Sequence, residues 1–112
     1  MQNETITKEG FISSFIEWVR ANEARLVADN ITIRLPEKIL AEGTYAEFFA
    51  ASGEATVEMW DYGFSEFHVW MHHGNPKQEE VKTTHYEFQD FDEMYIALNL
   101  LINRLSPILA LV

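Results

Sequence analysis

The chain has 112 residues, of which 47% are hydrophobic, enough to form one domain with a compact core. It contains no cysteine, which excludes disulfides, thiolate metal sites and a cysteine nucleophile. Its formal net charge of −10 disfavours direct binding of nucleic acid or anionic membranes and favours basic partners. The first ten residues have neither the basic start nor the apolar run of a signal peptide, so we expect a soluble cytoplasmic protein.

The first expected element is a helix over residues 8–28. Apolar residues recur there at helical spacing, from Phe11 to Val27. Thr7 is suited to cap its start, and Asp29-Asn30 to end it.

Alternation of apolar and polar residues then predicts five strands. A short first strand runs from Ile31 to Leu35, and Pro36 ends it because proline lacks a ladder donor. Glycines bound the next segments, and a turn-rich stretch precedes the last one. These strands are expected within residues 44–52, 54–62, 64–73 and 81–89.

The last expected element is a helix over residues 90–105, where Asp90 and Glu93 have the spacing of a capping box and Pro107 terminates the pattern. The element order predicts one α+β domain over residues 1–112. Its antiparallel β-sheet of four to five strands has the N- and C-terminal helices packed on one face. The other face must meet water or a partner.

Three of the four histidines lie between residues 59 and 75, which raises the question of a metal site. In a strand, however, His68 and His72 are about 13 Å apart, and His72 and His73 point to opposite faces. A zinc site would need His85 and carboxylates from neighbouring strands to converge. Phosphate-binding loops, nucleotide fingerprints and nucleophile motifs are absent from the sequence. We therefore expect no metal, no cofactor and no enzymatic activity.

The register of the central hairpin can be predicted from its apolar pattern. A three-residue loop over residues 61–63, with Gly63 in a left-handed conformation, places the apolar residues of both strands in one core. This register sets Glu58 opposite Glu66 and Trp60 opposite Phe64. Like charges directly across a ladder are destabilising, so stability alone does not favour the two glutamates.

The next strand extends the same outward face. Placing Tyr86 and Phe88 in the core is predicted to align Glu87 with His68 and His85 with Trp70. Aromatic anchors among carboxylates suit the capture of a positively charged protein surface. The predicted partner-binding residues are Glu58, Trp60, Asp61, Phe64, Glu66, His68, Trp70, His85 and Glu87.

Two plainer explanations of these residues remain open. Loops or a second copy of the chain can cover Trp60 and Trp70, and the acidity can serve solubility alone. From Ile39 to Pro76, six carboxylates occur without a lysine or arginine: Glu42, Glu47, Glu54, Glu58, Asp61 and Glu66.

The run ASGEATVEMWDYGFSEFHVW, residues 51–70, resembles a segment of small bacterial immunity proteins of the TriTu type. FIEWVRANE resembles their first helix, and HYEFQDFDEMYIALNLLINRL their last strand and helix. The fixed points of the resemblance are Trp60 and Gly63. It implies a protein that neutralises a cognate polymorphic or contact-dependent growth inhibition toxin, commonly a nuclease. Such toxins need basic surfaces to bind phosphates, which agrees with an acidic inhibitor.

The alternative function is that of a type III secretion chaperone, because these chaperones are also small, acidic and α+β. They usually dimerise, and the apolar tail PILALV is compatible with a dimer. We expect a monomer or a weak homodimer that binds no nucleic acid directly and no membrane.

Overall fold

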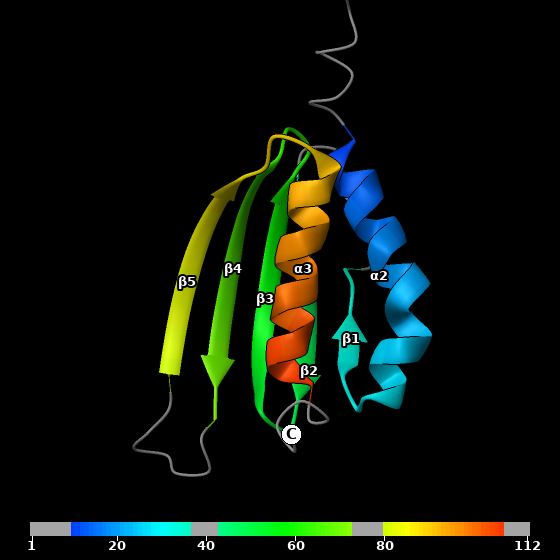
Figure 1. The fold of residues 1–112 in the computed structure, drawn as a ribbon, viewed down its shortest axis with the longest axis vertical. Coiled ribbons are helices and arrows are strands. Elements are labelled where there is room, and N and C mark those ends of the chain that lie inside the picture. Colours follow the sequence, from blue (N-terminus) through cyan, green and yellow to red (C-terminus); the bar gives the residue numbers. More distant parts are fainter. Residues whose placement is uncertain (1–9, 37–42, 73–79, 107–112) are drawn as a thin grey trace, which may run out of the picture.

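The computed structural model describes residues 10–36, 43–72 and 80–106. In this part of the chain, two helices lie side by side on one face of a five-stranded antiparallel sheet (Figure 1). The predicted α-β-β-β-β-β-α order and the α+β class are confirmed. In chain order the elements are α2 (Phe11–Ala28), β1 (Thr32–Arg34), β2 (Gly43–Ala50), β3 (Gly53–Trp60), β4 (Phe64–Met71), β5 (Glu80–Glu87) and α3 (Phe91–Leu105).

Helix α2 begins three residues later than predicted. Gly10 is its N-cap, in a left-handed conformation and with no side chain to accept from the helix amides. The predicted end is confirmed, because Asp29 is the C-cap and Asn30 has a positive φ of 62°. Thr7 lies outside the described residues.

Sheet order follows chain order, so every neighbouring pair of strands is also sequential. The predicted register of the β3–β4 hairpin is confirmed, with Glu58 directly opposite Glu66. Gly63 has a φ of 102°, and its N–H donates to the carbonyl of Trp60. A Cβ at Gly63 would lie 2.6 Å from the carbonyl oxygen of Phe88, so the loop needs glycine for its conformation and for this close approach.

The predicted β4–β5 register is wrong by four residues. His85 pairs with Glu66 instead of Trp70, and Glu87 pairs with Phe64 instead of His68. Strand β5 ends at Glu87, and the N–H of the next residue, Phe88, donates to the carbonyl of Gly63 beside the hairpin loop. An even shift leaves each side chain on its predicted face, since strand side chains alternate with a period of two.

The predicted start of α3 is confirmed. Asp90 is its N-cap, and its Oδ1 accepts from the N–H of Glu93 at 2.9 Å. The Glu93 carboxylate accepts from the N–H of Gln89 at 2.7 Å, one residue before the cap. This reciprocal pair is close to the capping box that the spacing predicts.

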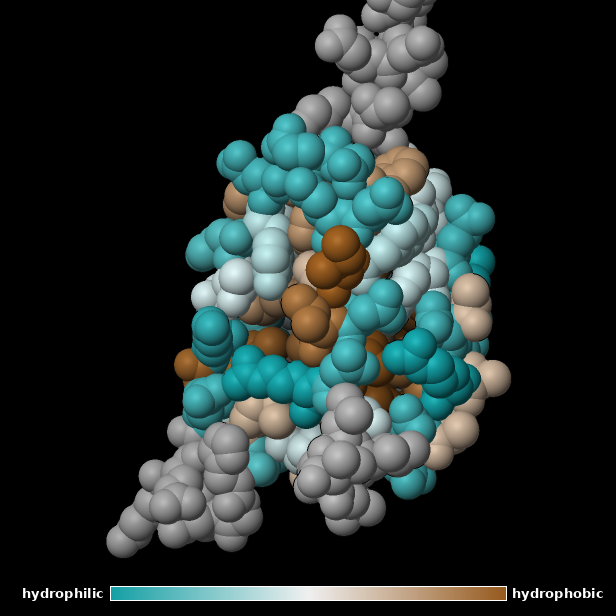
Figure 2. Space-filling view, viewed as in Figure 1, coloured by the Kyte–Doolittle hydropathy of each residue, from teal (hydrophilic) through white to brown (hydrophobic). Residues whose placement is uncertain are grey.

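The core lies between the helices and the inward face of the sheet. Phe11, Phe15, Val57, Met59 and Phe67 are among its buried members. The helix side is not wholly polar, since Figure 2 shows apolar side chains over α3 among hydrophilic ones. Ile96 and Leu100 are the large exposed apolar residues of this helix.

Candidate functional site

The strand registers define an outer face, the side of the sheet that points away from both helices. Buried residues alternate with outward ones along β2, β3 and β4, and the outward ones are partly or fully exposed. No described outer-face residue is buried. The outer face comprises Thr32, Arg34, Tyr45, Glu47, Phe49, Glu54, Thr56, Glu58, Trp60, Phe64, Glu66, His68, Trp70, Val81, Thr83, His85 and Glu87.

Eight of the nine predicted partner-binding residues lie on this face, with Asp61 as the exception. The eight are Glu58, Trp60, Phe64, Glu66, His68, Trp70, His85 and Glu87. These eight residues fall into two groups. Charged and imidazole groups gather around Glu66, and aromatic rings stand at the two ends of the hairpin.

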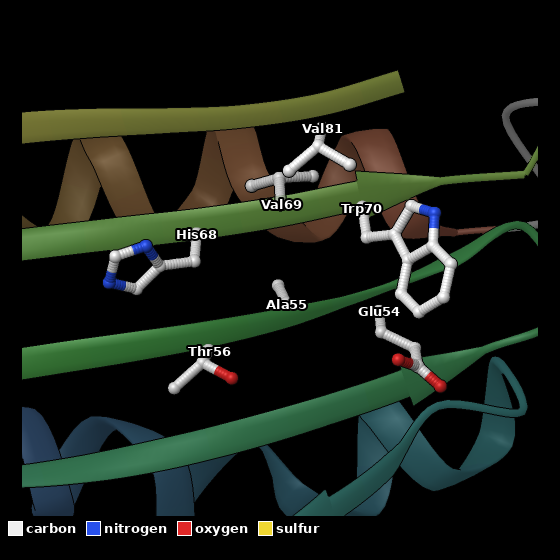
Figure 3. A pocket seen from close by; sticks show the side chains of 7 residues that line it. All are labelled: Glu54, Ala55, Thr56, His68, Val69, Trp70 and Val81. Carbon is white, nitrogen blue, oxygen red and sulfur yellow. The ribbon is translucent and has the colours of Figure 1, made fainter. Parts of the chain in front are cut away.

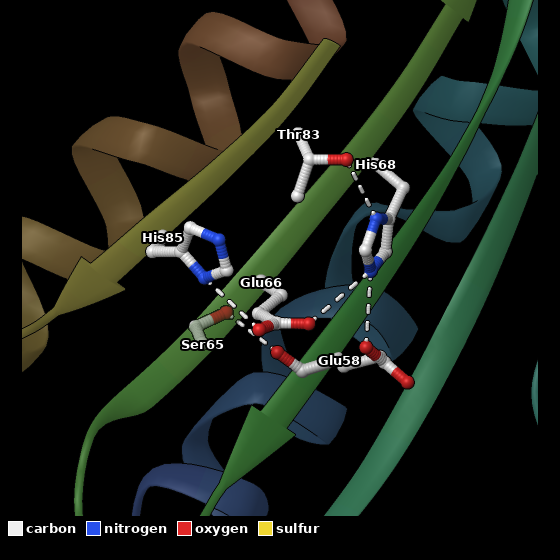
Figure 4. Close-up of polar contacts among 6 residues, drawn as sticks. All are labelled: Glu58, Ser65, Glu66, His68, Thr83 and His85. Atoms are coloured by element: carbon white, nitrogen blue, oxygen red, sulfur yellow. Dashed lines mark hydrogen bonds and ion pairs between the residues drawn. The ribbon is translucent and has the colours of Figure 1, made fainter. Parts of the chain in front are cut away.

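The charged cluster is centred on the two facing glutamates (Figure 4). His68 Nε2 lies 3.1 Å from a carboxylate oxygen of Glu58 and 3.5 Å from one of Glu66. Its Nδ1 lies 3.0 Å from the hydroxyl of Thr83. With the proton on Nε2, the ring donates to the carboxylates and accepts from Thr83, so both ring nitrogens are satisfied. His68 thereby offsets part of the repulsion between the glutamates.

His85 completes the cluster from β5. Its Nδ1 lies 2.9 Å from the second carboxylate oxygen of Glu66, directly across the strand pair. Glu66 is consequently contacted by an imidazole on each side, and its side chain is only 25% exposed. The hydroxyl of Ser65, on the inward side, donates to the backbone carbonyl of Glu58 at 2.6 Å and holds the hairpin together beneath the cluster.

The convergence of donors that a zinc site requires is partly realised. One donor atom each from Glu58, Glu66 and His68 lies within 4.8 Å of the others. Oxygen and imidazole donors of this kind suit zinc, although structural zinc sites usually take four protein ligands. His85 contacts the same Glu66 but does not belong to this group of three donors. The same contacts form a hydrogen-bonded network, because His68 and His85 each have a carboxylate partner.

The aromatic rings occupy both ends of the hairpin. Trp60 packs on Phe64 near the loop, with ring centroids 5.3 Å apart. Trp70, at the other end, packs against the ring of His72 at 5.0 Å and remains 39% exposed. Neither indole lies beneath a helix, since both strands point these side chains away from the core.

Asp61 has a different environment from the other predicted residues. It follows β3 at the hairpin loop, and its Oδ1 accepts from the N–H groups of Gly10 and Ile12, each at 3.2 Å. These amides belong to the start of α2, which has no cap of its own. The structure therefore gives Asp61 the position of a helix cap supplied from a distant part of the chain.

Several outer-face residues are not among the nine predicted partner-binding residues. Tyr45, Glu47 and Phe49 extend the face onto β2, and Glu54 and Thr56 extend it along β3. The alternation of apolar and polar residues along β2 and β3, with a period of two, could have predicted that these residues point outward. Glu47 differs from the other glutamates because Arg34 lies across from it, at 3.8 Å between charged atoms.

Among the described residues, no helix combines the length and the apolar character needed to cross a membrane. Comparisons of the chain with models of protein families, with curated proteins and with solved structures return no match. The resemblance to immunity proteins therefore stays a prediction. The fold and the site define an α+β domain whose sheet has one helix-covered face and one open face, and the open face is acidic and aromatic.

Proposed function

We propose that the protein is a non-enzymatic immunity protein, and that its outer face binds a basic, nuclease-type toxin. The observation that supports this most directly is the openness of the outer face. Trp60, Trp70 and the surrounding glutamates are all solvent-accessible in the part of the chain that the structure describes. Large aromatic rings that stay exposed among carboxylates are typical of a binding surface.

The charge of the outer face suits a cationic partner. Glu54, Glu58, Glu66 and Glu87 have no lysine or arginine partner among residues 10–36, 43–72 and 80–106. A nuclease must carry lysine and arginine on the surface that binds phosphates. Complementary fields of this kind raise association rates and exclude partners of the wrong charge.

The aromatic residues supply the contact energy. Interface hot spots are enriched in tryptophan and tyrosine, which gain binding energy when a partner covers them. Trp70 and Tyr45 retain exposures of 39% and 40%, so a partner can bury both. Trp60 is more rigidly held, because its ring rests on Phe64.

Binding kinetics with the product of the adjacent gene test the proposal. We expect Trp70→Ala to weaken binding by about 30-fold, which is about 2 kcal/mol, mainly through faster dissociation. Glu66→Lys and the exposed variant Glu87→Lys should slow association and flatten its salt dependence. Leu100→Ala is the matched control, because Leu100 is 64% exposed on the helix side. Normal kinetics in the outer-face variants, with a loss in Leu100→Ala, would refute the proposed surface.

A second candidate, a secretion chaperone, is favoured by the helix side. A partly apolar groove of about 280 Å³ lies between β5 and α3, lined by Tyr86, Phe88, Ile96, Ala97 and Leu100 together with Glu87 and Glu93. Secretion chaperones bind extended apolar segments of their effectors, and this groove is a surface on which such a segment could lie. A tight dimer that binds an unfolded effector segment, measured by sedimentation, would favour this function over toxin inhibition.

A further inference from the structure

A shallow hollow lies on the outer face beside Trp70 (Figure 3). It has a volume of about 200 Å³. The hollow exists because the outward side chain of Thr56 is short, whereas those of its neighbours are long. The lining residues are Glu54, Ala55, Thr56, His68, Val69, Trp70 and Val81.

The hollow places an aromatic ring next to a carboxylate. Glu54 lies directly across from Trp70 in the β3–β4 register, and both side chains extend from the same side of the sheet. Glu54 makes no hydrogen bond or ion pair within the described parts of the chain. His68 does not compete for it, because its ring nitrogens contact Glu58, Glu66 and Thr83.

The size and chemistry of the hollow limit what it can hold. Pockets for drug-sized ligands usually enclose about 300–1,000 Å³, so this hollow is suited to a single side chain. An indole face attracts cations, and a carboxylate beside it adds a hydrogen-bond acceptor. Arginine satisfies both, since its planar guanidinium stacks on a ring while its N–H groups donate in the plane. The ammonium of lysine is compact and strongly hydrated, which suits this geometry less well.

We propose that the hollow binds an arginine side chain of the basic partner, stacked on Trp70 and paired with Glu54. This inference rests on the proposed function, because it identifies the group by which the outer face recognises its partner. It assigns a direct contact with the partner to Glu54, which is not among the nine predicted partner-binding residues. Thr56 and Val81 form the walls that keep the guanidinium against the indole.

The proposal can be tested without the partner, by NMR titration of the ¹⁵N-labelled chain with Nα-acetyl-arginine methylamide. We expect saturable shifts of the Trp70 indole N–H, assigned with Trp70→Phe, and a Kd on the order of 1 mM. The lysine analogue should bind several-fold more weakly. The citrulline analogue has a similar shape and no charge, so it should leave the indole signal unchanged.

Two charge-matched variants separate the hollow from the general field of the protein. Glu54→Gln should weaken binding of the arginine probe about 5-fold to 10-fold, as expected for the loss of one charged hydrogen bond. Glu87→Gln removes the same charge across from Phe64, away from the hollow, and should change the affinity less than 2-fold. Equal losses in both variants, or equal shifts with citrulline, would overturn the proposal.

Failure of this inference is distinguishable from failure of the proposed function. A toxin that binds the chain tightly and tolerates Glu54→Gln, together with no saturation by the arginine probe, would refute the hollow alone. Saturation by the probe with no binding of the adjacent gene product would refute the toxin as partner and leave the arginine site in place.

Discussion

Asp61→Ala should destabilise the protein, because the Asp61 side chain caps a helix that starts in a distant part of the chain. The Oδ1 of Asp61 accepts from the N–H groups of Gly10 and Ile12 at the start of α2. The backbone N–H of Phe11 also donates to its carbonyl oxygen, at 3.4 Å. Asp61→Ala removes the side-chain acceptor while the backbone contact can remain. The substitution should therefore affect folding more than binding.

The size of this effect follows from the two contacts. A side-chain N-cap contributes about 0.5–2 kcal/mol, and a negative charge at a helix N-terminus adds about 0.3–1 kcal/mol. We expect Asp61→Ala to lower the free energy of unfolding by about 2 kcal/mol. For a domain of this size each kcal/mol lowers Tm by about 4–6 °C, so Tm should fall by about 8–12 °C. Asp61→Asn keeps an oxygen acceptor and loses the charge, and it should lose about half as much.

Urea unfolding followed by circular dichroism measures the change in stability, and toxin association by biolayer interferometry measures the change in binding. Asp92→Ala is a useful control, because it removes a carboxylate from the first turn of the other helix without removing its cap. An unchanged urea midpoint in Asp61→Ala, combined with slower toxin association, would refute the capping role. That result would return Asp61 to the interface.

Three further substitutions test the packing that supports the outer face, each by urea unfolding. Gly63→Ala should cost at least about 2 kcal/mol, because φ is 102° and the new Cβ meets the carbonyl oxygen of Phe88; an unchanged midpoint would show that the loop can relax. Thr44→Val should stabilise the protein by about 1 kcal/mol, because the buried Thr44 hydroxyl has no hydrogen-bond partner among the described residues, and a lower stability would contradict this. Ser65→Ala should cost about 1 kcal/mol through loss of the bond to the Glu58 carbonyl, and a neutral result would show that this bond is not stabilising.

The sequence was most informative where local chemistry decides the structure. The loop at Gly63 could be predicted because a three-residue hairpin needs one residue with positive φ, and glycine adopts it without strain. This loop fixes the register of the β3–β4 hairpin, and the pairing of Glu58 with Glu66 follows from that register. The cap of α3 is also local, since Asp90 and Glu93 are three residues apart.

The register of β4 with β5 could not be predicted in the same way. Eight residues separate Met71 from Glu80, and a connection of that length does not dictate the pairing as a two- or three-residue loop does. Alternation fixes only which face a side chain occupies, and every even shift satisfies it equally. The observed pairing is set at the far end of the strands, where the N–H of Phe88 bonds to Gly63 and its ring packs near Phe11.

Polar contacts between distant parts of the chain could not be predicted from local sequence patterns either. The Asp61 carboxylate and the amides of Gly10 and Ile12 are separated by 51 and 49 positions in the chain, and no spacing rule connects them. The contact of His85 with Glu66 could be seen only with the correct β4–β5 register. Membership of the outer face was predictable, whereas the partners within it were not.

Carboxylate footprinting tests the central claim most directly, because it labels the acidic residues of both sides of the sheet in one experiment. The chain is labelled with carbodiimide and glycine ethyl ester, alone and in complex with the adjacent gene product, and the sites are quantified by mass spectrometry. We expect the complex to protect Glu54, Glu58 and Glu87 on the outer face and to leave Asp92 and Glu93 on α3 as reactive as in the free chain. Protection of the α3 carboxylates with full labelling of the outer face would contradict the account.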